Sequence, residues 1–138
     1  MTIVADTGAV FALVDARERH HRMLRDLFER DPEAWVLPWA ILPEVDYLVA
    51  KHLGARVEGE FLEDLADGAW AVEWGAEGDL AEARRICRKH RGLNFGLVDA
   101  CVMAVAQRLG ADAIATLDVR DFGAVALQGS PRLYPRDL

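Results

Sequence analysis

Four acidic residues have types and positions suited to metal-dependent chemistry. Asp6 follows the short apolar run IVA, and Asp118 follows the apolar run AIATL. Glu44 and Asp99 lie near the starts of two segments with helical periodicity. If these carboxylates meet, each close pair repels by about 4 kcal/mol at an effective dielectric near 20. Mg²⁺ or Mn²⁺ would remove that repulsion, because hard divalent cations prefer carboxylate oxygens.

Asp99 poses the sharpest question of the four. The stretch GLVDACVMAVAQRLG, residues 96–110, predicts a helix, and Asp99 lies on its apolar face, three residues before Val102 and four before Met103. A buried ion without a partner costs several kcal/mol, so an inward carboxylate requires compensation. A simpler interpretation places Asp99 in the first helical turn, where the helix dipole stabilises an exposed carboxylate by about 0.3–1 kcal/mol.

The other acids also have simpler interpretations. Asp6 has the residue type of a helix N-cap, and Asp118 that of a turn residue. Asp121 stands close to Asp118 in the chain and could take either role, that of the turn residue or that of the site acid. Glu44 and Asp46 flank the same apolar stripe from its two sides, and periodicity does not choose between them.

The predicted elements would bring these acids to one edge of a sheet. Strands are predicted at residues 2–5, 34–38, 70–74 and 112–117, with a last short strand VALQ at 125–128 after a turn. Helices are predicted at 8–16, 20–30, 40–54, 55–68, 79–92 and 96–110. This alternation predicts an α/β fold with a mostly parallel sheet covered on both faces. Such sheets place function outside the carboxyl ends of their strands.

Composition favours one cytoplasmic domain spanning residues 1–138. No apolar run approaches the ~18 residues of a membrane span, and the N-terminus lacks the basic region of a signal peptide. The net charge of −7 argues against non-specific nucleic-acid binding, but not against an enzyme that holds cations at carboxylates. Cys87 and Cys101 lack zinc-ligand spacing.

Several other features are interpreted first as structural. The basic run at 84–91, RRICRKHR, is interpreted first as a solvated helix face and second as a surface that could contact nucleic-acid phosphates. His20 and His21 are adjacent and would point apart on a helix, so they indicate a surface helix start. The helix at 20–30 is expected to turn four side chains inward: Met23, Leu24, Leu27 and Phe28. The four tryptophans are assigned to the core or a dimer interface: Trp35, Trp39, Trp70 and Trp74.

Taken together, four motifs resemble the PIN-domain ribonucleases, specifically the VapC-type toxins of bacterial toxin–antitoxin pairs. In chain order they are IVADTGAVFALVD, LPEVDYLVAKHLG, GLVDACVMAVAQRLG and IATLDVRDF. The resemblance implies a three-layer α/β/α domain around a mostly parallel sheet of four or five strands. It implies an endoribonuclease that depends on Mg²⁺ or Mn²⁺. It also implies that the catalytic and metal-binding residues are Asp6, Glu44, Asp99 and Asp118.

The resemblance carries further expectations. It selects Glu44 over Asp46, because the family's acid stands in an E-V-x-Y-L context. It makes Thr7 and Thr116 site-wall residues that hydrogen-bond a carboxylate, water or phosphate. The expected partners are an RNA substrate, a cognate antitoxin and a second copy of the chain.

Two residues near Asp118 are assigned supporting roles at the site. Arg120 would meet a phosphate or neutralise neighbouring acids. Asp121 would support Asp118 or replace it as the fourth acid.

Two other classes of protein remain as alternatives. A metal-dependent phosphatase of α/β fold is the strongest rival enzyme, although the haloacid-dehalogenase type places a second acid two residues after the first, where this chain has Gly8. A phosphorelay receiver needs a lysine after a late strand, whereas Lys51 and Lys89 both fall in predicted helices. The non-enzyme alternative is a binding module whose acidic cleft serves only for docking.

Overall fold

The computed structural model describes residues 1–138 and contains one five-stranded sheet. Its strands are β1 (Ile3–Ala5), β2 (Trp35–Pro38), β3 (Ala71–Glu73), β4 (Ala113–Ala115) and β5 (Arg132–Tyr134). They lie in the order β3-β2-β1-β4-β5, and every neighbouring pair is parallel. The expected parallel α/β sheet is therefore confirmed, and all five strands end at the same edge.

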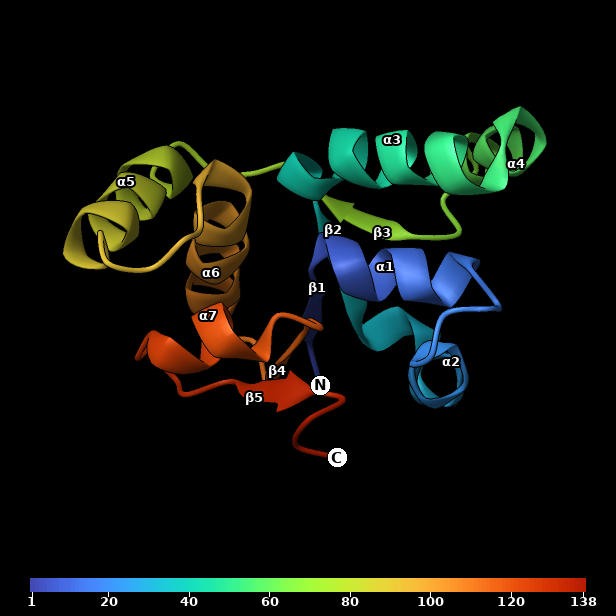
Figure 1. The fold of residues 1–138 in the computed structure, drawn as a ribbon. Helices are drawn as coiled ribbons and strands as arrows, with labels where there is room; N and C mark the ends of the chain where they lie inside the picture. The colour runs from blue at the N-terminus through green and yellow to red at the C-terminus, as the bar shows by residue number, and fades with distance from the viewer.

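Helices cover both faces of the sheet (Figure 1). They are α1 (Thr7–Val14), α2 (His21–Arg30), α3 (Leu42–Leu53), α4 (Ala55–Ala66), α5 (Asp79–Lys89), α6 (Leu97–Leu109) and α7 (Val119–Ala124). Helices α1 to α4 lie on one side, and α5 and α6 pack against each other on the opposite side. This is the three-layer arrangement that the resemblance implies.

The strands at the centre of the sheet are apolar along their whole length because both of their faces are covered. Ile3, Val4 and Ala5 of β1 are buried. On one side they meet α6, in which every residue from Ala100 to Ala106 is buried. The strands and helices packed against β1 fix the point at which the chain leaves the sheet. They therefore also fix the position of the acidic residue that follows the strand.

The C-terminal region differs from the sequence prediction. VALQ (125–128) is not a strand; the last strand is Arg132–Tyr134, which pairs with β4. Gly129 and Ser130 adopt positive φ angles of 81° and 45° and turn the chain before this strand. The predicted turn after Asp118 contains helix α7, for which Asp118 is the N-cap.

The large apolar side chains divide between the core and the surface. Of the tryptophans assigned to the core or a dimer interface, Trp35 is buried in the core, whereas Trp39 and Trp74 are 39% and 75% exposed. Met23 was expected to face inward with Leu24, yet it is 50% exposed while Leu24 is fully buried. The helical period places Met23 at the edge of the apolar stripe, and nothing packs over it.

An ion-pair cluster that sequence reasoning missed joins three elements. The Arg108 guanidinium of α6 donates to both carboxylate oxygens of Asp79 on α5, at 2.7 and 3.0 Å. It also donates to Glu73 of β3 at 2.8 Å.

None of the helices of the structure is long and apolar enough to cross a bilayer.

Candidate metal centre

The predicted acids all stand at the starts of helices. Asp6 is the N-cap of α1 and Asp118 the N-cap of α7. Glu44 and Asp99 lie in the first turns of α3 and α6. Helix N-termini carry a partial positive charge that stabilises carboxylates and also attracts phosphate groups. The simpler interpretations of Asp6 and Asp99, as helix-start residues, are therefore compatible with a shared site, and Asp118, first interpreted as a turn residue, is the N-cap of α7.

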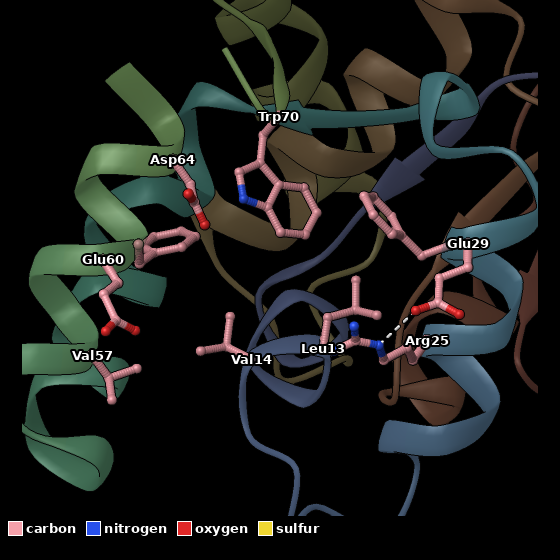
Figure 2. Close-up of a pocket in the computed structure, with 10 residues that line it drawn as sticks. Leu13, Val14, Arg25, Glu29, Val57, Glu60, Asp64 and Trp70 are labelled. Carbon is pink, nitrogen blue, oxygen red and sulfur yellow. Dashed lines mark hydrogen bonds and ion pairs between the residues drawn. The ribbon is translucent and has the colours of Figure 1, made fainter. Parts of the chain in front are cut away.

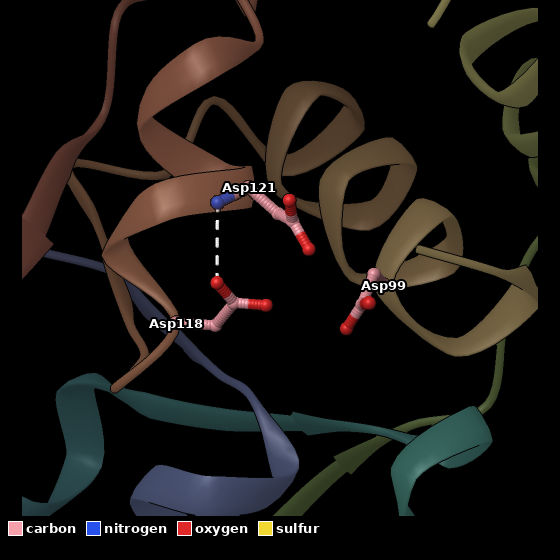
Figure 3. A group of neighbouring side chains, drawn as sticks. All are labelled: Asp99, Asp118 and Asp121. Carbon is pink, nitrogen blue, oxygen red and sulfur yellow. Dashed lines mark hydrogen bonds between the residues drawn. The ribbon is translucent and has the colours of Figure 1, made fainter. Parts of the chain in front are cut away.

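Three carboxylates from α6 and α7 come together (Figure 3). Asp99, Asp118 and Asp121 each offer an oxygen, and these oxygens all lie within 4.8 Å of one another. The Asp121 amide donates to Asp118 Oδ1 at 3.1 Å, which caps α7 and leaves the other Asp118 oxygen free. Asp121, assigned only a supporting or alternative role from the sequence, is buried and belongs to this group. The sequence signal that could have placed Asp121 in the group is its position three residues after Asp118, which puts both residues at the start of the same helix.

Asp6 lies behind the group and is connected to it through Thr116. Asp6 is 6% exposed and makes no side-chain capping bond, so its carboxylate is not used to start α1. The Thr116 hydroxyl donates to Asp6 Oδ2 at 2.9 Å and accepts the Asp118 amide at 3.0 Å. One buried hydroxyl thus connects the acid after β1 with the acid after β4.

Burial and neighbouring acids raise the pKa of Asp6 and of Asp99. Burial raises the pKa of Asp6 to about 6, against the hydrogen bonds from Thr7 and Thr116, and the charges of Glu44 and Asp118 contribute to the rise. Burial raises the pKa of Asp99 to about 7, with further contributions from the surrounding acids, of which Asp6 contributes most. Such clustered and mutually repelling acids are typical of functional sites.

The charge of Arg120 acts on the neighbouring Asp121. Burial and the neighbouring Asp118 raise the pKa of Asp121 above its ordinary value, while the Arg120 guanidinium lowers it. Arg120 is exposed on α7, so its charge is also open to a phosphate approaching from solvent.

The structure separates Glu44 from Asp46. Glu44 is exposed and outside the group of three, but its charge raises the pKa of both Asp6 and Asp99. The carboxyl group of Asp46 faces Glu58 of α4 instead and raises the pKa of Glu58 through a shared hydrogen bond. The charge of Glu44 therefore reaches Asp6 and Asp99, whereas the carboxyl group of Asp46 interacts with α4.

The donor set fits a divalent cation. It consists of carboxylate oxygens, which Mg²⁺ and Mn²⁺ prefer, and the raised pKa values show the repulsion that a cation would remove. The Thr7 hydroxyl, beside Asp6 in the chain, is buried without a hydrogen-bond partner. A buried polar atom of this kind calls for a ligand or water. His20 and His21 lie at the start of α2, as predicted, but both are half-buried, and His21 Nδ1 lies 2.7 Å from the carbonyl oxygen of Ala12.

Comparison with known proteins agrees with this geometry. The PIN domain family model matches residues 3–127. The chain is 32% identical over 130 residues to Ribonuclease VapC26 of Mycobacterium tuberculosis (strain ATCC 25618 / H37Rv), covering 94% of this chain and 96% of the relative.

Solved structures share the fold at lower identity. Mycobacterium tuberculosis VapC20, described as a sarcin-ricin loop cleaving toxin, superposes with a TM-score of 0.80 at 22% identity, over 93% of this chain and 98% of that chain. A toxin–antitoxin complex from Klebsiella pneumoniae gives a TM-score of 0.69 at 17% identity, over 90% of this chain and 92% of that chain.

Proposed function

Because this chain belongs to the PIN-domain family, we propose that it is a metal-dependent endoribonuclease of VapC type, the toxin of a toxin–antitoxin pair. The observation that carries the proposal is the meeting of Asp99, Asp118 and Asp121 within 4.8 Å, with Asp6 behind them. Carboxylates so arranged suit phosphodiester hydrolysis at a cation.

In this proposal Asp6, Asp99, Asp118 and Asp121 hold Mg²⁺ or Mn²⁺, and Glu44 faces the site from α3. The bound cation supplies an acidified water and neutralises charge on the phosphate. Thr116 keeps Asp6 oriented and ionised by donating a hydrogen bond to it. The N-termini of α1, α6 and α7 favour the approach of a phosphate.

Cleavage of a mixed RNA pool tests the proposal. Purified protein is compared in Mg²⁺, Mn²⁺ and EDTA, with Asp99→Asn prepared in parallel. Wild type should cut only with metal, and Asp99→Asn should lose at least a hundredfold in rate. Equal cutting by both proteins would mean a contaminating nuclease.

Two matched variants of α3 refine the test. Glu44→Gln should lower cleavage, whereas Asp46→Asn, two residues away and turned toward Glu58, should not. If wild type binds Mn²⁺ but cuts no RNA, hydrolysis of a phosphomonoester would instead support the phosphatase. Inactivity on both substrates would support the binding module.

We propose that the antitoxin occupies a groove between α1, α2 and α4 (Figure 2). This cavity of about 400 Å³ shares no lining residue with the proposed metal site. Six of its lining residues are apolar, among them Phe28, Phe61 and Trp70. Apolar surface of this kind suits an amphipathic segment of a partner.

The charged lining of the same groove indicates the chemistry of that segment. Arg25 pairs with Glu29 at 2.8 Å, and Glu60 pairs with Arg56, while Asp64 has no ion-pair partner. The surplus of acids favours an apolar segment flanked by basic residues. Co-expression with the cognate antitoxin should yield a complex that Val57→Glu disrupts and Leu62→Glu, exposed on the same helix and outside the groove, does not.

We also propose a homodimer formed through a surface patch of Trp39, Trp74 and Leu80. These side chains line one hollow and are 39%, 75% and 58% exposed. Large apolar side chains gathered on a surface mark interaction sites, and a second copy of the chain offers the same patch in return.

A further inference from the structure

A second cavity, of about 340 Å³, shares a wall with the acid site. It lies between the loop that joins α1 to α2, helix α2 itself, the segment after β4 and the segment after β5. Thr116 lines it, and the Thr116 hydroxyl donates to Asp6 at 2.9 Å. Thr116 therefore lines the cavity and contacts the carboxylate of Asp6 as well. Its volume falls in the range of about 300–1,000 Å³ that small-molecule sites occupy.

The lining of this cavity has the opposite charge to the rest of the protein. The chain carries a net charge of −7, yet none of the residues lining the cavity is acidic and three of them are basic. Arg136 pairs with Asp137 and His20 with Glu18, whereas Arg19 has no ion-pair partner. The cavity therefore presents a free guanidinium next to a strongly acidic centre.

The remaining surface of the cavity is apolar and reachable from solvent. Met23 and Val119 line it and are 50% and 40% exposed, and Leu117 and Pro135 complete it. This lining suits an unpaired nucleobase, because unpaired RNA bases stack on His rings and Arg guanidinium planes, and extruded bases are held between apolar side chains. The adjoining phosphate would meet Arg19.

We propose that this cavity holds one nucleotide of the RNA, next to the phosphate that is cleaved. The inference rests on the proposed ribonuclease function and adds the place where sequence is read. Carboxylates at the cation cannot distinguish bases, since they meet only the phosphate. Selection therefore falls to the neighbouring cavity, which predicts a base preference at one position flanking the cut.

Binding of single nucleotides tests the cavity independently of cleavage. AMP, GMP, CMP and UMP are titrated into the protein in EDTA, and amide shifts are followed by NMR. Amide signals from residues 116–120 and from Arg136 should move for at least one nucleotide. Met23→Trp, which fills the cavity from its exposed edge, should weaken that binding at least tenfold. Leu62→Trp, at an exposed position of α4, is the matched control and should bind nucleotides as wild type does.

Sequencing of the cut sites in a randomised RNA pool provides the second measurement. Wild type should show a bias at one flanking position, and Met23→Trp should lose that bias and cut the preferred sites at least tenfold more slowly. The proposal is overturned if no nucleotide moves those amides, or if Met23→Trp binds and cuts as wild type does. If wild type cuts no RNA at all, the ribonuclease proposal fails, and the nucleotide titration still decides whether the cavity binds.

Discussion

Replacing Asp99 with asparagine should stabilise the metal-free protein at pH 8, although it removes a proposed metal ligand. Burial and the charges of the surrounding acids raise the pKa of Asp99 from 3.8 to about 7. At about 1.4 kcal/mol for each pH unit, this rise corresponds to an upper limit of about 4 kcal/mol. Asp99 is only partly buried, so solvent screening reduces the expected gain to about 1–2 kcal/mol.

The effect should depend on pH in a defined direction. The folded-state pKa lies above the unfolded value, so ionised Asp99 destabilises the folded protein above pH 7. The destabilisation should shrink as the pH falls from about 7 toward 3.8 and disappear below that. The difference between Asp99→Asn and wild type should therefore be largest at pH 8.

Thermal unfolding in EDTA measures this difference. For a chain of this length, 1–2 kcal/mol raises Tm by about 3–8 °C. Adding Mn²⁺ should reverse the order, because ligand binding stabilises wild type more than the variant. Asp26→Asn, an exposed aspartate on α2, should match wild type throughout. An Asp99→Asn protein no more stable than wild type in EDTA at pH 8, with an unchanged response to Mn²⁺, would refute the reasoning.

Three further predictions follow from other contacts. Thr116→Val removes the hydrogen bond that favours ionised Asp6, so the pKa of Asp6 should rise above about 6 and the pH needed for Mn²⁺ binding should increase; an unchanged pH dependence would contradict this role. Arg108→Ala should cost about 2 kcal/mol in urea unfolding at pH 7, and less at acid pH, because the Arg108 guanidinium lowers the pKa of Asp79; equal losses at both pH values would argue against it. Trp74→Glu should give a monomer by light scattering where wild type is a dimer, and a dimeric variant would place the interface elsewhere.

The outline of the fold could be predicted because its signals are local. Apolar runs bounded by turn residues indicated four strands, and helical periodicity indicated α1 to α6. The errors fall where local signals compete. VALQ has the composition of a strand, but the edge position beside β4 is taken by Arg132–Tyr134, and that choice depends on pairing rather than composition. The exposure of Met23, which was predicted to face inward, likewise depends on what packs over it.

The sequence alone determined which acids come directly after strands and at helix starts, because these positions are local properties of the chain. Parallel strands end at one edge, so it also determined that Asp6 and Asp118 lie on the same edge. Only the tertiary structure decided that Asp121 joins Asp99 and Asp118, that Thr116 bridges Asp6 to Asp118, and that a cationic cavity adjoins them. These outcomes depend on distances between segments up to 110 residues apart in the chain, which no local pattern encodes.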